Sequence, residues 1–309
     1  MEEKLYKEVS PIQRKRKALV LGLLFVSPWL IGFIIFQLYP IIMSFYYSLT
    51  EYNLFTSPKW VGLENYKSLF QDKKFYLSLY NTVYITVFGL FPHLIFALLM
   101  AVILNTNVKG QSFYRTIYFL PTLVPAVAGS LLWLWLFNAQ YGLINEFLGA
   151  IGFVQPNWLV DPQWAKPAII IMGFWATGTN TIMYLAALQD VPQTFYEAAE
   201  IDGANRWQKF LHITLPAISP ISLFLVLMGL IGSFQFFTQG LIFGEATQSM
   251  GGPENSLLFY AIYLYQTAFS FLKMGYASAM AWVLFVIVLI LTIFIFKSSA
   301  KWVYYGGEK

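Results

Sequence analysis

The chain has 309 residues, of which 58% are hydrophobic and 11% are charged, and its formal net charge is +4. Soluble domains carry about 25% charged residues, so this composition excludes an ordinary soluble enzyme and a disordered chain. A mean hydropathy of +0.60 and 19% aromatic residues indicate a polytopic membrane protein instead. Because the chain has no cysteine, it forms neither disulfide bonds nor thiolate metal sites.

Six segments of the chain are apolar and long enough to cross a bilayer as helices. Such a helix needs about 20 apolar residues, because its backbone N–H and C=O groups must all be paired internally. The predicted spans, in chain order, are residues 18–39, 82–104, 116–137, 167–188, 220–243 and 276–297. The first is too long for a signal peptide and no cleavage motif follows it, so we interpret it as an uncleaved anchor. The expected fold class is an all-α polytopic membrane protein with six transmembrane helices.

A seventh uncharged run, residues 255–272, is interrupted by Gln266 and Thr267. We expect a short helix at the interface or dipping into the protein, with a genuine seventh span as the alternative. Lys and Arg are enriched in cytoplasmic loops. With six spans, thirteen of the 19 Lys and Arg residues lie on the side of both termini. This distribution predicts cytoplasmic termini in the plasma membrane and requires an even number of spans.

The predicted spans carry no Asp, Glu, Lys or Arg in their middle, where His93 beside Pro92 is the one titratable side chain apart from tyrosine. Carriers coupled to protons or sodium bind the ion through ionisable groups at membrane depth. A hydrogen bond at a helix contact near the proline explains His93 better than a coupling role. The sequence has no P-loop motif, so the energy for transport would have to come from another polypeptide.

The segment 189–219 is the only internal loop that is both polar and patterned as a helix. Pro192 suits a first helical turn, and Thr194 with Glu197 has the spacing of a capping box. Gly203 is placed to end this helix, because glycine adopts the left-handed conformation without a steric penalty. The expected structure is a helix that projects into the cytoplasm, with a merely solvated loop as the alternative.

A second short helix is expected in this loop, from about Asn205 to His212. Leu215-Pro216 would end it and lead into the fifth span, because the residue before a proline is driven out of the helical conformation. Two short helices joined by a glycine turn would therefore extend from the membrane.

The order of residues in this loop is specific. Glu197-Ala198-Ala199, Gly203, Ile213 and Leu215-Pro216 together reproduce the pattern EAA-x3-G-x9-I-x-LP. This loop resembles the signature loop of binding-protein-dependent ABC importer permeases, and Tyr196 to Ala204 is similar to their carbohydrate-uptake branch. The chain resembles the larger maltose-transporter membrane subunit in a short form, without that subunit's extra N-terminal spans and large external insertion.

Weaker similarities to the same branch cover most of the chain, from about residue 15 to residue 300. They are Tyr39-Pro40 with Ser44-Phe45, Val61 to Tyr66, Asn81-Thr82, Phe119 to Pro121 and Gly251 to Asn255. The resemblance implies a type I ABC importer transmembrane domain at 18–297, with a coupling loop at 189–216. A basic cytoplasmic segment, 1–17, would precede the domain, and a cytoplasmic tail, 298–309, would follow it.

The resemblance also implies roles and partners. The coupling loop would dock into a separate ATPase subunit, where Glu197 would pair with a basic residue. The implied ATPase-coupling residues are Glu197, Ala198, Ala199, Asp202, Gly203, Leu215 and Pro216, and the apolar anchors of the loop would be Phe195, Tyr196 and Phe210. The implied partners are a second, similar permease subunit in a heterodimer, two ATPase subunits and an external solute-binding protein. The chain itself would be no enzyme and would bind no cofactor, since ATP and Mg would be used by the partner ATPase.

The fourth and fifth spans flank this loop and have the most polar interior faces. Neutral hydroxyls and amides beside aromatic rings suit a sugar, whose hydroxyls need hydrogen-bond partners and whose C–H faces stack on aromatic planes. The candidate substrate-pathway residues are Trp175, Thr179, Ser233 and Gln235. Polar contacts between helices are the alternative role for each of them. Trp133 and Trp135 are expected in an aromatic belt at the outer interface.

These patterns predict one half of the membrane pathway of an ATP-driven sugar importer. An oligosaccharide, such as one released from a polysaccharide, is the expected substrate. Three alternatives stay open: a secondary carrier for a neutral solute, an ABC importer permease for another polar solute, and a membrane-embedded enzyme. The last would need a cluster of His, Asp or Glu near one membrane face, and several charges lie close together only in the segment 189–219.

Overall fold

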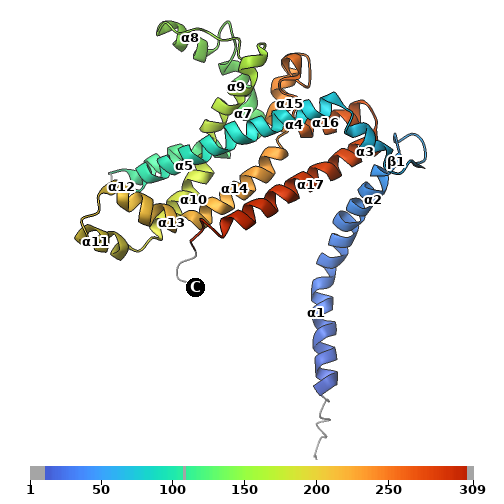
Figure 1. Cartoon of the computed structure of the whole chain (residues 1–309), viewed down its shortest axis with the longest axis horizontal. Coiled ribbons are helices and arrows are strands. Elements are labelled where there is room, and N and C mark those ends of the chain that lie inside the picture. The colour runs from blue at the N-terminus through green and yellow to red at the C-terminus, as the bar shows by residue number, and fades with distance from the viewer. Residues whose placement is uncertain (1–10, 107–108, 305–309) are drawn as a thin grey trace, which may run out of the picture.

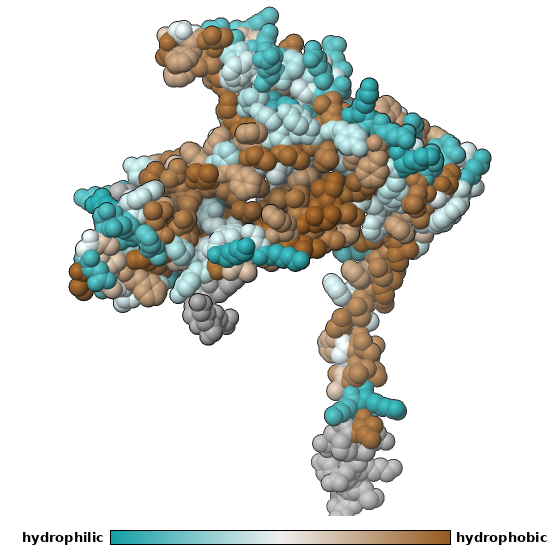
Figure 2. Space-filling view, in the orientation of Figure 1, coloured by the Kyte–Doolittle hydropathy of each residue, from teal (hydrophilic) through white to brown (hydrophobic). Residues whose placement is uncertain are grey.

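The computed structural model of the protein describes residues 11–106 and 109–304. Residues 1–10 of the predicted N-terminal segment and 305–309 of the predicted tail lie outside these ranges. Helices make up most of the described chain, and its strands β1 (Thr50–Glu51) and β2 (Lys59–Trp60) pair antiparallel in one short hairpin. Apolar side chains cover the middle of the helices, and polar ones gather at the outer loops and at the opposite end (Figure 2).

The first span is one long helix that stands apart from the others (Figure 1). It is built from α1 (Pro11–Phe33), the π-helical turn η1 (Ile34–Leu38) and α2 (Tyr39–Ser48), so it extends beyond the predicted limits of 18–39. The wider π turn accommodates Pro40, which lacks the N–H that a regular helix needs. The most apolar window of this helix has no buried residues, and only α2 packs on the bundle, against α17 (Met274–Ser299).

The second and sixth spans are long helices of the bundle. The second comprises α4 (Lys73–Ile85), the π turn η2 (Thr86–Leu90) and α5 (Phe91–Leu104), and the sixth is α17. The second span begins before the predicted residue 82, because Asp72 caps the helix by accepting a 2.8 Å hydrogen bond from the backbone of Lys74. The predicted span 276–297 lies within α17.

Three of the six predicted spans are broken helices. The third joins α6 (Gln111–Phe119) and the 3-10 turn η3 (Leu120–Leu123) to α7 (Ala126–Leu136) through a bend of 97°. The fourth joins α9 (Pro162–Trp175) to α10 (Gly178–Gln189) through a bend of 46°. The fifth comprises α14 (Ser219–Phe234) and α15 (Thr238–Glu245). The single helices predicted at 116–137, 167–188 and 220–243 are therefore each interrupted.

The breaks have local causes. Pro121 and Pro125 flank the bend in the third span, and neither can donate a backbone hydrogen bond. Gly178 at the break in the fourth span lies against the third, where an added Cβ would come within 2.7 Å of the Tyr118 carbonyl oxygen. The two breaks are therefore packed against each other, and only a glycine permits the approach.

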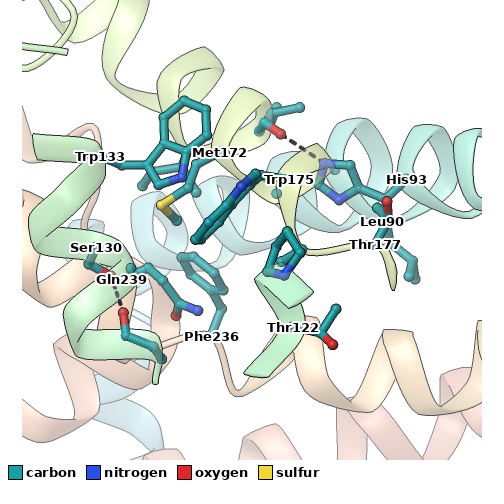
Figure 3. Close-up of a pocket in the computed structure, with 18 of the residues that line it drawn as sticks. Leu90, His93, Thr122, Ser130, Trp133, Met172, Trp175, Thr177, Phe236 and Gln239 are labelled. Atoms are coloured by element: carbon teal, nitrogen blue, oxygen red, sulfur yellow. Dashed lines mark hydrogen bonds between the residues drawn. The ribbon is translucent and has the colours of Figure 1, made fainter. Parts of the chain in front are cut away.

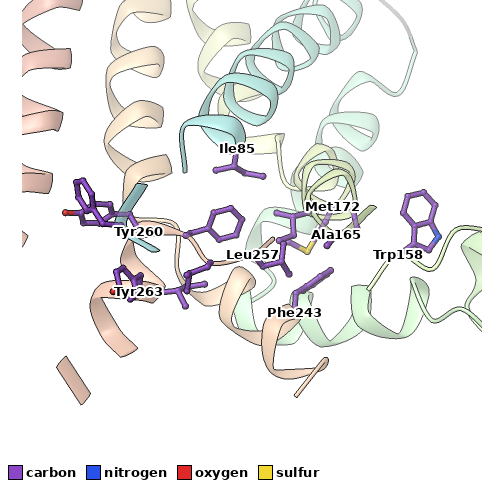
Figure 4. Close-up of a cluster of buried hydrophobic side chains, with 14 of the residues drawn as sticks. Ile85, Trp158, Ala165, Met172, Phe243, Leu257, Tyr260 and Tyr263 are labelled. Carbon is purple, nitrogen blue, oxygen red and sulfur yellow. The ribbon is translucent and has the colours of Figure 1, made fainter. Parts of the chain in front are cut away.

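Shorter elements cover one end of the bundle, which is named the outer end because the distribution of Lys and Arg predicts that it faces outward. They are α3 (Glu64–Leu69), α8 (Leu143–Ala150), the 3-10 turn η5 (Pro253–Asn255), α16 (Tyr260–Tyr265) and the π turn η6 (Gln266–Ser270). The run 255–272 is thus a short helix dipping into the protein, as the sequence predicted, and Tyr260 and Ile262 in it are fully buried. Its side chains join Phe243 and Trp158 in a buried apolar cluster (Figure 4).

Asp72 joins three helices at this end of the bundle. Its carboxylate caps α4 and accepts hydrogen bonds from the hydroxyl of Tyr263 on α16 and, at 2.9 Å, from that of Tyr276 on α17. Partial burial alone would raise the pKa of Asp72, but these hydroxyls and the backbone amides of Lys74 and Phe75 together lower it. The folded protein therefore favours the ionised carboxylate more than the unfolded chain does.

We expect Asp72→Asn to lower stability by about 1–3 kcal/mol at neutral pH, because it weakens the bonds from two tyrosine hydroxyls. Since the folded-state pKa lies below the unfolded value, the contribution is fully present above the unfolded pKa of about 3.9 and is lost as the pH falls through the folded pKa. Thermal unfolding in detergent between neutral and acidic pH measures both effects. Asp161→Asn is the control, because Asp161 caps α9 in the same way. Equal losses in the two variants would show that the tyrosine contacts contribute nothing.

Candidate functional site

The coupling loop forms a bent protrusion at the end of the bundle opposite the outer loops (Figure 1). It consists of α11 (Gln193–Ile201), α12 (Arg206–Lys209), the π turn η4 (Phe210–Thr214) and α13 (Leu215–Ala217). The capping box predicted for Thr194 and Glu197 is wrong, since Pro192 is the N-cap and no side chain caps α11. The capping box lies instead on the second helix, between Asn205 and Gln208.

Gly203 ends the first helix as the sequence predicted. Its φ is +78°, and its N–H donates to the Glu200 carbonyl while the N–H of Ala204 donates to that of Ala199. These two bonds form a Schellman motif, which requires a left-handed residue at this position. An added Cβ would meet no atom within 4 Å, so the need for glycine here comes from the backbone alone.

The second helix continues further than predicted. It passes through Leu215-Pro216 to Ala217, because the π turn before it accommodates the proline ring, and the chain bends only at Ile218. The expected stop at Leu215-Pro216 and the expected end at His212 are therefore wrong.

Two side-chain contacts fix the angle between the short helices. Lys209 Nζ lies 2.5 Å from Glu200 Oε1, and the Tyr196 hydroxyl lies 2.9 Å from Thr214 Oγ1. The hydrogen bond from Lys209, assisted by its charge, lowers the pKa of Glu200, so the contact favours the ionised carboxylate. The protrusion is therefore a braced unit that joins α10 to α14.

The exposed surface of the protrusion combines a carboxylate with apolar side chains. Glu197 is exposed and makes no ion pair with any residue that the structure describes. Phe195, Ile201 and Trp207 are 54%, 88% and 66% exposed, which is typical of a protein-docking surface. Ile201 and Trp207 were not singled out from the sequence. Of the residues that were, Tyr196 faces Thr214, and Phe210 stacks on Trp207 with ring centroids 5.6 Å apart.

A cavity of about 540 Å³ lies where the three broken spans meet. Its lining includes Thr122 and Val124 at the first break, Ala176 and Thr177 at the second, and Phe236 at the third. Irregular backbone at membrane depth is tolerated where it is buried in protein or lines a water-filled cavity. The breaks therefore identify this cavity as the candidate pathway for a polar solute.

The structure places three of the four predicted pathway residues in the cavity lining, namely Trp175, Thr179 and Ser233. Gln235 is exposed and lies outside the lining, whereas Gln239, one turn further on, belongs to it. The break between α14 and α15 separates these two glutamines. Trp175 projects between Trp133 and Phe236 (Figure 3).

Trp133 does not fit the interfacial belt expected from the sequence, since it lines the cavity 6.2 Å from the Trp175 ring. Its indole Nε1 is buried and has no hydrogen-bond partner among the described residues. Trp135 is 49% exposed, which is consistent with the expected belt. The sequence could not distinguish these two tryptophans, because they are two residues apart in a span that is apolar on all sides.

His93 contacts the fourth span, as the sequence interpretation favoured. Its Nε2 lies 2.8 Å from the Ile170 carbonyl oxygen, and its ring packs edge-to-face on Phe174 with centroids 4.5 Å apart. Gly173 makes room for the ring, because a Cβ there would lie 2.1 Å from a His93 carbon. His93 therefore holds α5 against α9.

The described lining contains no Asp, Glu, Lys or Arg. Its hydroxyls at Thr122, Ser130 and Ser233 donate to carbonyls of their own helices, while Asn180 and Gln239 contribute amides. Polar neutral groups beside aromatic rings can accommodate a polyhydroxylated solute, and they offer no charge for a coupling ion.

A neutral cavity within broken helices and a braced protrusion below it define a membrane component of a transport system. Residues 93–303 match the family described as "Binding-protein-dependent transport system inner membrane component". The chain belongs to this family, and it is a multi-pass membrane protein.

The chain is 41% identical to the probable ABC transporter permease protein YesP of Bacillus subtilis (strain 168), over 95% of each chain. It is 38% identical to the lactose transport system permease protein LacF of Rhizobium radiobacter, over 93% of this chain and 96% of the other. Among solved structures, a bacterial alginate ABC transporter in complex with an alginate pentasaccharide-bound periplasmic protein contains a similar chain. The TM-score is 0.80 and the identity 25%, over 93% of this chain and 96% of that one. The type I importer fold implied by the coupling loop is therefore confirmed.

Proposed function

We propose that the protein is a permease subunit of an ATP-driven importer and moves an oligosaccharide across the plasma membrane. The observation that carries this proposal is the coupling loop, in which the EAA pattern is folded as a braced protrusion with a free carboxylate and exposed apolar side chains. The sugar is supported by the uncharged, aromatic cavity, and by relatives whose names specify lactose and alginate.

The protrusion would receive its motion from a separate ATPase subunit that uses ATP and Mg. Glu197 would pair with a basic group there, while Phe195, Ile201 and Trp207 would fill apolar pockets. Gly203 and the Glu200–Lys209 contact keep the angle of the protrusion fixed, so a displacement of the ATPase would move α10 and α14 together. These two spans contribute Thr179, Asn180 and Ser233 to the cavity, which would open alternately to the two sides.

A second, similar permease subunit would complete the pathway. The long first helix leaves the bundle with its apolar faces uncovered, so it has surface available for another subunit as well as for lipid. The loops around α3 and α8 would face an external solute-binding protein. Both termini would lie in the cytoplasm, as the distribution of Lys and Arg indicates.

Uptake of labelled oligosaccharides into vesicles tests the proposed function. Vesicles holding both permease subunits and the ATPase, supplied with the binding protein, should accumulate sugar only when ATP is present on the cytoplasmic side. Accumulation by this chain alone, driven by an ion gradient, would show a secondary carrier instead. If the vesicles take up only non-sugar solutes with ATP, the protein is still an ABC importer permease, but the proposal that its substrate is a sugar is wrong.

Glu197→Gln should weaken binding of the ATPase subunit more than about tenfold, because removing one partner of a buried ion pair costs about 2–5 kcal/mol. Copurification of the ATPase with the tagged permease measures the loss. Glu146→Gln on α8 is the matched control, since it removes an equally exposed carboxylate from the opposite end of the molecule. If the two variants retain the ATPase equally well, Glu197 is not part of the docking surface.

A further inference from the structure

Lys166 is a cation at the outer end of the fourth span, and none of the functions above uses it. It lies on α9, half-buried against α4. Its Nζ donates a 2.9 Å hydrogen bond to Asn81 Oδ1, and lies 5.1 Å from the centre of the Tyr80 ring and 4.8 Å from that of Tyr84. The ammonium group is thus held beside two aromatic faces, and both rings belong to α4.

The buried side chain of Asn81 fixes the position of this ammonium group. Asn81 is 1% exposed, and its Nδ2 donates to the carbonyl oxygens of Asn255 and Leu258, at 2.9 and 3.1 Å. These bonds orient Oδ1 toward Lys166. A lysine that only anchors a helix extends its ammonium group toward water, whereas Lys166 turns inward to a buried amide. The lysine is therefore positioned by the fold.

The ammonium group has hydrogen-bonding capacity left over. Lysine carries three N–H donors, and Asn81 accepts one. No carboxylate lies within ion-pair distance of Lys166 among residues 11–106 and 109–304. An anion could therefore bind without displacing a protein carboxylate, between the ammonium group and the exposed Tyr80 ring.

Lys166 lies on the face of α9 that leads into the cavity. Ile169, Ile170 and Gly173 line the cavity, and they follow Lys166 at the three-, four- and seven-residue spacings that share one helix face. At 1.5 Å per residue, Gly173 is about 10 Å further along the axis. Ile85, the neighbour of Tyr84, also lines the cavity. The cation and its two rings therefore stand at the outer approach to a cavity whose own lining is uncharged.

We propose that Lys166, Tyr80 and Tyr84 form an outer binding site for a carboxylate-bearing sugar unit, so that the imported oligosaccharides include uronates. The inference rests on the proposed function and specifies its substrate. The ammonium group would bind the carboxylate through charge-assisted hydrogen bonds, and the tyrosine rings would contact the C–H face of the same sugar. The rest of the oligosaccharide would extend toward Trp175 and the neutral amides.

Paired substrates test this site in the complete transporter. Uptake into vesicles is measured for short oligouronates prepared from alginate and pectate, and for the same oligosaccharides with each carboxylate reduced to an alcohol. The variants are Lys166→Met, which keeps the length of the side chain without its charge, and Lys166→Arg, which keeps the charge. Lys73→Met is the control, because Lys73 is an exposed cation at the outer end of α4.

We expect Lys166→Met to lower uptake of the oligouronates at subsaturating concentration by about tenfold, as loss of a charge-assisted contact implies. It should change uptake of the reduced sugars less than about twofold, and Lys166→Arg and Lys73→Met should stay near wild type. If Lys166→Met lowers uptake of the oligouronates and of the reduced sugars equally, the lysine only stabilises the structure. If it lowers uptake of neither, the lysine does not contact the transported sugar. Both results overturn the inference, as does a wild-type transporter that imports only the reduced sugars. A wild-type complex that imports no sugar of either kind with ATP refutes the proposed function itself.

Discussion

Replacing Gly203 with valine should uncouple transport while leaving membrane insertion intact. The Schellman motif at the end of α11 requires φ near +78° at this position, and a left-handed conformation costs an L-residue about 1–2 kcal/mol. A strain of this size lowers the population of the correctly angled protrusion by about five- to thirtyfold. ATP-driven uptake should fall to a similar extent, because the angle between α11 and α12 sets how Glu197 and Trp207 lie relative to each other.

Gly152→Val provides the control for backbone strain. Gly152 also has a φ of +78°, and an added Cβ would likewise meet no atom within 4 Å, but it lies in the outer loop after α8. Both variants should reach the membrane in wild-type amounts, and only Gly203→Val should lose uptake and sugar-stimulated ATP hydrolysis. Normal uptake in Gly203→Val would mean that the angle of the protrusion does not matter for coupling.

The number of spans was predictable from the sequence because it follows from one rigid requirement. A chain in lipid must pair its backbone groups internally, so each run of about 20 apolar residues is read as a helix. The same reasoning could not locate the breaks, since a broken helix has the composition of a straight one. Pro121 and Gly178 mark two breaks, but proline at positions 40, 92 and 216 is accommodated by π turns instead. Tertiary packing decides between these outcomes.

In the coupling loop too, features set by local sequence were predictable, and features set by tertiary contacts were not. Gly203 was predictable because its role in the fold is a single φ angle, whereas the docking role of Glu197, which comes from a fixed pattern, stays a prediction. The capping box was misplaced, since Pro192 and not Thr194 is the N-cap of α11, and the box that forms is that of Asn205 and Gln208 on α12. Lys166 was one of the six Lys and Arg residues that the sequence placed on the side opposite the termini. Its contact with Asn81 joins residues 85 positions apart, a separation that sequence spacing does not describe.

Trp175→Ala should cause the largest loss of transport among changes in the cavity. The indole projects between Trp133 and Phe236 and closes the lining at the break between α9 and α10 (Figure 3). Its removal takes away the aromatic plane on which a sugar would stack and enlarges the cavity there. Aromatic anchors in desolvated sites contribute about 2 kcal/mol or more, which corresponds to about a thirtyfold decrease in uptake at low sugar concentration.

Trp135→Ala separates this effect from a general loss of packing. Trp135 is the same residue type on the adjacent helix α7, but it is half-exposed and lies outside the cavity lining. Uptake in Trp135→Ala should remain within about twofold of wild type, and Trp175→Phe should restore much of the activity because it keeps an aromatic plane. Basal ATP hydrolysis and copurification of the ATPase should be unchanged in all three variants, since the coupling loop is untouched. If Trp175→Ala transports as well as Trp135→Ala, the sugar does not pass through this cavity, and the breaks in the three spans serve only helix packing.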